Sequence, residues 1–189
     1  MAKLLFLDLE TTGTDKNRHG VIQIAGILEI DGVEQVRFDL FSSLFPGDIV
    51  NKEALKINGR SIEDIRKFPK PEKTYSDFMA ILGKHINPYD KKDKFYIVGY
   101  NSRFDDDFLR EWFRKCSDKY YGAYFFWPSI DVSNMAALHF MEDREKFKDF
   151  KLMTVAQMAG IDISGDNLHD ASFDVEITRK LFYLLKRSI

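Results

Sequence analysis

The chain has 189 residues, of which 44% are hydrophobic, 14% aromatic and 31% charged, and its formal net charge is −2. This composition excludes a disordered chain and predicts one globular domain over residues 1–189 with a sizeable core. The slightly acidic charge argues against a tight, nonspecific binder of duplex nucleic acid, and no apolar run is long enough to cross a membrane.

The first predicted element is a buried strand over Leu4 to Leu9, in which Asp8 is followed two positions later by Glu10. Side chains alternate between the two faces of a strand, so Asp8 and Glu10 point to one side and the leucines at 5, 7 and 9 point to the other. Two readings stay open at this point. Either the strand ends in a solvated turn, or the paired carboxylates form a site for Mg²⁺ or Mn²⁺, because a divalent cation offsets their repulsion.

The next segments predict an antiparallel meander. A polar loop, Thr14 to Gly20, precedes two β-rich runs, Val21 to Ile30 and Val33 to Phe41. The dipeptide Asp31-Gly32 between these runs is a strong signal for a two-residue hairpin. Gly26 inside the first run predicts a bulge or a close approach of another backbone.

Short helices are predicted after the meander. The first covers Val50 to Ile57 and ends at Asn58-Gly59. The second begins at the N-cap Ser61 and closes at Pro69 and Pro71. The third begins at Thr74. A strand over Phe95 to Tyr100 and an amphipathic helix over Phe104 to Lys115 follow. Cys116, the one cysteine, is interpreted as a plain helix residue. A single cysteine excludes an internal disulfide, which favours a reducing, cytoplasmic location.

The segment from Lys119 to Trp127 is unusually aromatic. We interpret it as a core strand with its preceding loop, with Phe125 and Phe126 in the core, although exposed rings there could also stack on bases. The remaining pattern predicts helices over Val132 to Met141 (capped by Asp131), Leu152 to Ala159 and Asn167 to Lys186, with a loop from Arg144 to Lys151.

Asp174 falls on the apolar stripe of the last predicted helix, together with Val175, Thr178 and Leu181. A lone carboxylate in that position would cost several kcal/mol or stay protonated. Its position therefore indicates a bound cation. His169 precedes Asp174 by five residues, near the start of this helix and off its apolar stripe.

Three motifs carry a family resemblance, and they occur in order over nearly the whole chain: Asp8-Leu9-Glu10-Thr11-Thr12-Gly13, Asn101-Ser102-Arg103-Phe104-Asp105 and His169-Asp170-Ala171-Ser172-Phe173-Asp174. Together they resemble the DEDD exonuclease family in its DnaQ-like, His-containing branch (DEDDh). The sister branch carries a tyrosine four residues before the last aspartate, where this chain has Asp170. His169, five residues before, favours the His branch.

The resemblance implies an α/β fold of the ribonuclease H-like type, a mixed five-stranded sheet with helices on both faces. It also implies a site in which two divalent cations, Mg²⁺ or Mn²⁺, bind to Asp8, Glu10, Asp105 and Asp174, roughly 3.5–4 Å apart. His169 would act as the general base. The choice of Asp105 over its acidic neighbours rests on the Asn-x-x-Phe that precedes it.

The activity implied is that of a 3′–5′ exonuclease, which releases nucleoside 5′-monophosphates from single-stranded or frayed 3′ ends, with DNA favoured. Backbone groups near Thr11 and Thr12 would hold the terminal 3′-hydroxyl, and Asn101 and Phe104 would shape the cleft. The turn over Lys56 to Ser61 corresponds to one that the family places beside the cleft, although it also fits an ordinary helix–helix turn.

Several alternatives stay open from the sequence. The substrate could be RNA, as in RNA-trimming members of the family, and the chain could be a proofreading subunit of a polymerase. A binding module that has lost catalysis is a different class, and the presence of all five expected residues argues against it. The sequence ends directly after the last predicted helix, so we expect no extended polymerase-binding tail. The oligomeric state is not predicted.

Overall fold

The computed structural model of the chain describes residues 2–164 and 170–187, and its centre is a five-stranded sheet in the order β3-β2-β1-β4-β5. The strands are β1 (Lys3–Thr11), β2 (Val21–Ile30), β3 (Val33–Phe41), β4 (Tyr96–Gly99) and β5 (Ile130–Asp131). The first three form an antiparallel meander, whereas β4 runs parallel to β1 and β5 parallel to β4. The predicted mixed five-stranded sheet and its meander are therefore confirmed.

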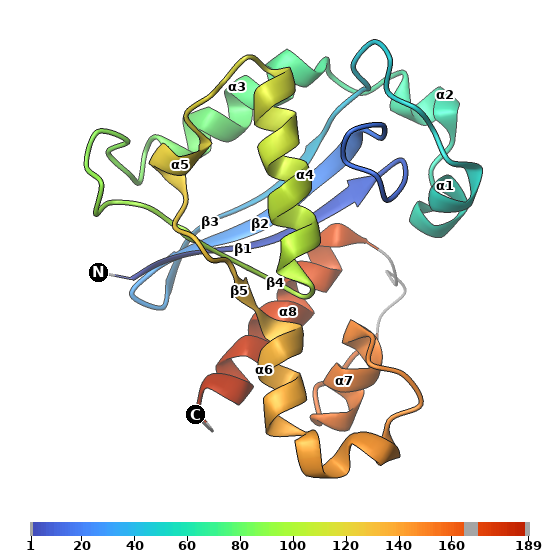
Figure 1. The fold of residues 1–189 in the computed structure, drawn as a ribbon, viewed down its shortest axis with the longest axis vertical. Helices are drawn as coiled ribbons and strands as arrows, with labels where there is room; N and C mark the ends of the chain where they lie inside the picture. The colour runs from blue at the N-terminus through green and yellow to red at the C-terminus, as the bar shows by residue number, and fades with distance from the viewer. Residues whose placement is uncertain (1, 165–169, 188–189) are drawn as a thin grey trace.

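Helices cover both faces of this sheet (Figure 1). On one face lie α3 (Pro71–Leu82), α4 (Ser102–Lys115) and α5 (Tyr121–Tyr124); on the other lie α6 (Val132–His139), α7 (Leu152–Met158) and α8 (Ala171–Lys186). A 3₁₀ helix, η1 (Met141–Lys146), follows α6. The short helices α1 (Lys52–Asn58) and α2 (Ile62–Ile65) lie beyond the carboxyl end of β1.

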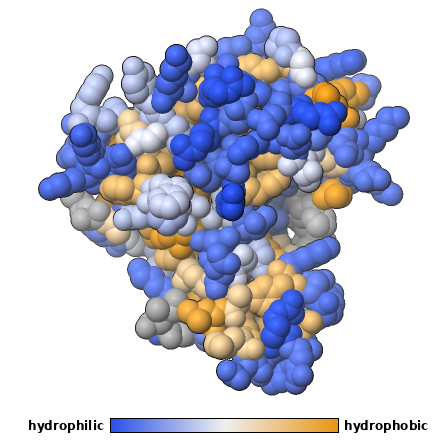
Figure 2. Space-filling model, viewed as in Figure 1, coloured by the Kyte–Doolittle hydropathy of each residue, from blue (hydrophilic) through white to orange (hydrophobic). Residues whose placement is uncertain are grey.

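Strand β1 divides the core into two layers by its alternation. Leu5, Leu7 and Leu9 pack against α3 and α4, whereas Leu4 and Phe6 pack against α6 and α8. Asp8 and Glu10 have the parity of Leu4 and Phe6, so both acids face α8, as the alternation predicts. Figure 2 shows polar side chains over most of the upper half of this view and apolar ones gathered lower down, over α6 and α7.

The hairpin between β2 and β3 turns as its dipeptide predicts. Asp31 and Gly32 both have left-handed backbones, with φ of 50° and 81°, which is the conformation that a tight hairpin turn needs. Gly26 is a position of close approach: a Cβ there would lie 2.4 Å from Cζ of Phe38, its cross-strand partner. The sequence predicted a bulge or a close approach of another backbone here, and the neighbour that requires glycine is instead the Phe38 side chain.

Some predicted boundaries are wrong. The helix expected to close at Pro69 and Pro71 ends at Ile65, and Pro71 instead begins α3. Proline fits the first turn of a helix because its missing N–H needs no partner there. Thr74 is therefore inside α3, and its hydroxyl donates to the carbonyl of Phe41 at 2.7 Å.

The aromatic segment also differs from its prediction. Tyr121–Tyr124 is a short helix, α5, and the fifth strand is the two-residue Ile130–Asp131. Asp131 is also the N-cap of α6, as predicted. Phe125 is buried and makes an isolated bridge with Phe95, as expected for a core residue, but Phe126 is half-buried and stacks on Tyr96. The part of the predicted last helix at 167–169 lies outside the described residues, and α8 begins at Ala171.

Candidate active site

Asp8 and Glu10 lie at the carboxyl end of β1, on the face that α8 covers. Both carboxylates are half-buried. At this end β1 extends beyond its parallel neighbour, because the pairing with β4 stops at Phe6↔Val98. The end of β1 therefore has no paired strand on its β4 side. The segment that follows β4 brings Asp105 to this position.

Asp105 fills this opening from the first turn of α4. Its side chain is 3% exposed, and its Oδ1 accepts a hydrogen bond from the backbone N–H of Leu9 at 3.1 Å. Asn101 starts α4 in a left-handed conformation, with φ of 64°, and its N–H donates to Oδ1 of Asp131 at 3.0 Å. The turn from β4 into α4 thus sets the position of Asp105 beside β1.

The last acids come from the start of α8. Asp170 is the N-cap of this helix, and its Oδ1 accepts from the N–H of Ser172 at 2.9 Å. Asp174 lies one turn later and is half-buried. His169, the predicted general base, lies outside the described residues, so its role stays a prediction.

These acids raise one another's pKa. Burial, and after it the neighbouring negative charges, hold the pKa of Asp8 well above its usual range; the charges belong to Asp105, Asp174, Glu10 and Asp170. Burial and the charges of Asp174 and Asp170 raise the pKa of Glu10 from 4.5 to about 7, although Arg60 opposes the shift. The predicted acids are therefore electrostatic neighbours, brought together from three separate parts of the chain.

The pKa of Asp105 is also raised. Burial is the largest cause, and the hydrogen bond from Leu9 works against it. A cluster of repelling carboxylates supplies the hard oxygen donors that Mg²⁺ and Mn²⁺ prefer, and a bound cation would reverse these shifts. Across residues 2–164 and 170–187, however, no three His, Cys, Asp or Glu side chains are arranged so that they could hold a metal ion. The oxygen donors fit a divalent cation, but these residues do not form a complete set of metal ligands.

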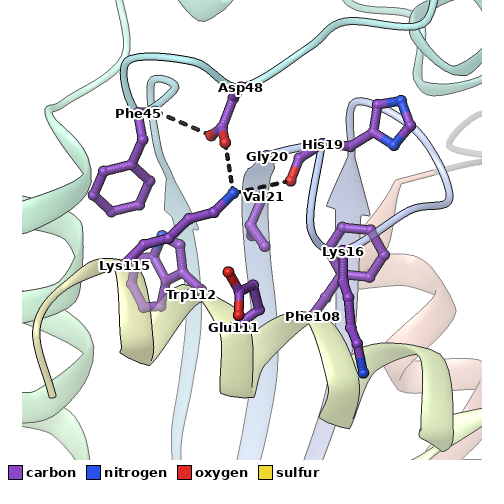
Figure 3. Close-up of a pocket in the computed structure, with 10 residues that line it drawn as sticks. All are labelled: Lys16, His19, Gly20, Val21, Phe45, Asp48, Phe108, Glu111, Trp112 and Lys115. Atoms are coloured by element: carbon purple, nitrogen blue, oxygen red, sulfur yellow. Dashed lines mark hydrogen bonds and ion pairs between the residues drawn. The ribbon is translucent and has the colours of Figure 1, made fainter. Parts of the chain in front are cut away.

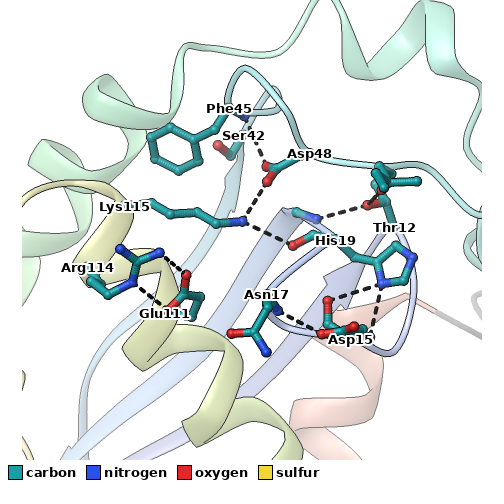
Figure 4. Close-up of polar contacts among 12 residues, drawn as sticks. Thr12, Asp15, Asn17, His19, Ser42, Phe45, Asp48, Glu111, Arg114 and Lys115 are labelled. Carbon is teal, nitrogen blue, oxygen red and sulfur yellow. Dashed lines mark hydrogen bonds and ion pairs between the residues drawn. The ribbon is translucent and has the colours of Figure 1, made fainter.

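The segment after Glu10 is held in place by an internal network (Figure 4). The hydroxyl of Thr12 donates to the carbonyl of Ile49 at 2.7 Å and accepts from the N–H of Gly20 at 2.9 Å. The backbone N–H of Thr12 donates to Gly20, and its carbonyl accepts from Asn51. The backbone groups of Thr12 are therefore used within the protein.

Thr11 is tied down in a similar way. Its hydroxyl donates to the carbonyl of Gly13 at 2.7 Å, and its own carbonyl accepts from the amide of Asn58 at 2.9 Å. The last residue of α1 is therefore anchored directly to the Asp8 motif. Substrate contact by Thr11 and Thr12 stays a prediction.

An ion pair fixes the loop behind this network (Figure 3). Nζ of Lys115, at the end of α4, lies 2.5 Å from Oδ1 of Asp48, and these side chains are only 16% and 4% exposed. Lys115 also approaches the carbonyl of His19 at 3.4 Å, and Asp48 accepts from the N–H of Phe45. The hollow beside them measures about 10 Å³, which has room for a water molecule at most and not for a ligand.

Phe104, one of the predicted substrate contacts, is half-buried and packs on Phe108 with ring centroids 4.7 Å apart. It lines a cleft of about 320 Å³ that the loop from Thr14 to Asn17 bounds. Asn101 is exposed. Phe104 directly precedes Asp105 and Asn101 is the N-cap of the same helix, and their contact with a substrate stays a prediction.

Three residues of this site had no individual role predicted from the sequence, although Asn58 and Arg60 belong to the turn over Lys56 to Ser61 that the family resemblance places beside the cleft. Asp170 adds negative charge beside Asp8 and Glu10, Asn58 holds the carbonyl of Thr11, and Arg60 places a positive charge near Glu10. Asp170 could have been found as the N-cap of the last helix, because aspartate is a preferred cap. The role of Asn58 had no local signal, because its partner is 47 positions away.

Comparison with known proteins places this architecture in a family. The model of the exonuclease family RNase_T matches residues 5–182. The chain belongs to this exonuclease family. The match includes all three motifs that resemble the DEDDh pattern, and the fold is the ribonuclease H-like one that the resemblance implies.

Curated relatives of this exonuclease chain are distant but cover most of it. Ribonuclease T of Haemophilus influenzae is 27% identical over 94% of this chain and 76% of its own length. The epsilon subunit of DNA polymerase III from Aquifex aeolicus is 24% identical over 93% of this chain and 76% of its own length. A PolC-type DNA polymerase III of Thermotoga petrophila is 25% identical over 96% of this chain, which spans only 12% of that polymerase.

Solved structures of Escherichia coli exonuclease I share the fold. A complex with a dT13 oligonucleotide superposes with a TM-score of 0.78 at 21% identity, over 98% of this chain. A zinc-bound complex with single-stranded DNA gives a TM-score of 0.80 at 22% identity. This chain spans 41% of those exonuclease I chains. In the part of the chain that the structure describes, we find no helix with the length and apolar character to cross a membrane.

Proposed function

We propose that this chain is a metal-dependent 3′–5′ exonuclease that hydrolyses nucleic acid to nucleoside 5′-monophosphates. The observation that carries the proposal is the group of mutually repelling carboxylates at the end of β1, where Asp8, Glu10 and Asp105 all have raised pKa values. Family membership supports the same chemistry. These acids come from β1, α4 and α8 and raise the pKa of Asp8 together, which favours a site that binds cations.

Asp8, Glu10, Asp105 and Asp174 would hold two divalent cations, Mg²⁺ or Mn²⁺. When bound, such ions supply Lewis-acid stabilisation of the negative charge that develops on a phosphodiester during hydrolysis. The chain's own residues would orient the reaction: the network at Thr11 and Thr12 holds the loop beside the acids, and Asn101 and Phe104 shape the cleft. His169 would accept the proton of the attacking water, which calls for its neutral imidazole.

The proposed substrate is a 3′ end of single-stranded or frayed nucleic acid, with DNA favoured. The exonuclease I structures are described with single-stranded DNA, whereas ribonuclease T carries RNA in its name, so both polymers are candidates. A second candidate function is proofreading beside a polymerase, which the similarity to a polymerase III epsilon subunit and to PolC-type polymerases favours. The reducing cytoplasm is the proposed compartment.

The experiment compares degradation of labelled single-stranded DNA, duplex DNA and RNA of the same sequence, with Mg²⁺ or Mn²⁺ and with EDTA. We expect metal-dependent release of 5′-mononucleotides, fastest on single strands. Asp8→Asn is the matched inactive variant, and Asp143→Asn, an exposed acid in η1, is the control that keeps activity. If Asp8→Asn degrades the substrates as fast as the unaltered chain, the proposal is wrong.

A further inference from the structure

A second cleft opens on the outer side of α4, away from the hollow beside Lys115. It measures about 720 Å³ and lies between α4 and the segment that leads into α6, with Arg103, Arg110, Trp127, Ser129 and Asn134 among its lining residues. Figure 1 shows the first turn of α4 close to the start of α6. The same turn carries Asp105 toward β1, so this cleft and the catalytic acids lie on opposite sides of one helical turn.

Trp127 is the main apolar feature of this cleft. Its side chain is 81% exposed, whereas Trp112, the other tryptophan of the chain, is buried at 2%. A large exposed ring offers a flat face on which a nucleobase can stack, and such stacking tolerates any base. The folded core gains little from a ring that is so exposed.

Two arginine side chains line the cleft, and they differ in whether they have a partner. Arg110 pairs with Asp106 at 3.6 Å and lies over the ring of Tyr121, whose hydroxyl also donates to Asp106. By contrast, Arg103 is exposed, and it has no hydrogen bond or ion pair with any residue in the described ranges. Its guanidinium is therefore available to a ligand.

The remaining acids of the lining are already engaged. Asp107 pairs with Lys16 at 2.9 Å, and Asp131 accepts hydrogen bonds from Asn101 and from the N–H of Ser133. The cleft thus combines an available guanidinium with an exposed indole. Phosphate and base are the two chemical groups that this pair fits, because arginine binds phosphate through parallel N–H donors.

We infer that this cleft binds the part of a single strand that lies 5′ of the cleavage site. A phosphate pairs with Arg103 and a base stacks on Trp127, while the 3′ end reaches the carboxylates on the other side of the first turn of α4. The inference rests on the proposed function for the direction of the strand. It makes Arg103 and Trp127 binding residues that act only on strands long enough to reach them.

The test measures binding of fluorescein-labelled thymidylate oligonucleotides by anisotropy, with EDTA present so that nothing is hydrolysed. For octathymidylate, Trp127→Ala should lose about 5- to 100-fold in affinity, as expected for one stacked base. Arg103→Ala should also bind more weakly, and its plot of log affinity against log salt should flatten by about 0.7, the contribution of one phosphate contact on a single strand. The dinucleotide should be affected less by either change, because it is too short to span both sites.

Two matched controls come from the loop before β4, at the other end of that strand. Tyr89→Ala removes a ring that is 94% exposed, and Lys92→Ala removes an exposed positive charge. Both should bind octathymidylate as the unaltered chain does. The inference would be overturned if Arg103→Ala and Trp127→Ala bound octathymidylate as tightly as the unaltered chain does. It would also be overturned if these variants lost the same factor of affinity for the dinucleotide as for octathymidylate.

Since the measurement needs no hydrolysis, it separates the inference from the proposed function. A chain that binds octathymidylate through Arg103 and Trp127 but degrades no substrate would support the cleft and refute the exonuclease. If the unaltered chain degrades single strands and the two variants bind and cleave as it does, the exonuclease is supported and the cleft is refuted.

Discussion

Oδ1 of Asp105 accepts a hydrogen bond from the backbone N–H of Leu9 at 3.1 Å, although 96 positions separate the two residues. The bond joins the first turn of α4 to the end of β1, at a point where β4 no longer pairs with β1. Asp105 therefore has two roles that can be separated: a hydrogen-bond acceptor for the strand and a negative charge for the site.

Two substitutions separate these roles. Asp105→Asn keeps an acceptor oxygen and removes the charge, so we expect hydrolysis to fall by at least about 10²-fold while stability stays near that of the unaltered chain. Asp105→Ala also leaves the buried N–H of Leu9 unsatisfied, which should lower the free energy of unfolding by about 1–3 kcal/mol. Single-turnover cleavage and urea unfolding measure the two effects. Normal turnover in the Asn variant would contradict the site, and equal stability of the two variants would contradict the structural role.

The raised pKa of Glu10 predicts a pH dependence of stability in the metal-free protein. Glu10 titrates near 4.5 as an ordinary side chain and near 7 in the folded chain. The folded state therefore binds more protons between these values, and the stability that this group contributes at low pH is lost as pH rises through about 7. Glu10→Gln does not titrate, so its free energy of unfolding should fall less over that range. Urea unfolding in EDTA tests this, and parallel curves for the two proteins would refute it.

Divalent metal should reverse this loss. Mg²⁺ or Mn²⁺ binds only the assembled site, so the melting temperature should rise with metal, by the equivalent of about 2.7 kcal/mol at a hundred times the dissociation constant. Asp8→Asn should reduce that rise, whereas Asp143→Asn in η1 should leave it unchanged. A melting temperature that ignores millimolar metal in the unaltered chain would show that the acids do not form a cation site.

The Lys115–Asp48 ion pair lies outside the cluster of acids, but it should contribute to the stability of the fold. Lys115→Met would leave the carboxylate of Asp48, which is 4% exposed, without its cation, at a cost of about 3–5 kcal/mol in the free energy of unfolding. Adding Asp48→Asn removes the stranded charge and keeps an acceptor for the N–H of Phe45, so the double variant should recover part of the loss. Urea unfolding of both measures this, and a double variant less stable than Lys115→Met would refute it.

Much of the fold could be predicted because its signals are local. The strands β2 and β3 have the predicted bounds, since their β-rich runs flank the turn Asp31-Gly32. The alternation of β1 predicted that Asp8 and Glu10 lie on the face opposite Leu7, and the apolar spacing predicted the helix that contains the buried Asp105. In each case neighbours in the sequence determine the outcome.

The errors arise where tertiary contacts decide. The run from Lys119 to Trp127 is rich in aromatic residues, which favour strands, but Tyr121–Tyr124 is helical, and the buried ring of Tyr121 packs against Phe113 on α4. The strand β5 has only two residues, too few to produce an alternation. The ion pair of Lys115 with Asp48 joins residues 67 positions apart, and no periodicity reports such a contact.

If these carboxylates make the chain a metal-dependent exonuclease acting from the 3′ end, it should shorten a strand stepwise from that end. The most direct measurement follows a single-stranded oligonucleotide labelled at its 5′ end, incubated with Mn²⁺ and sampled over time on a sequencing gel. We expect a ladder of labelled products that shorten one nucleotide at a time, and no ladder with EDTA. Immediate release of a labelled mononucleotide, or a full-length strand that persists in saturating Mn²⁺, would contradict it.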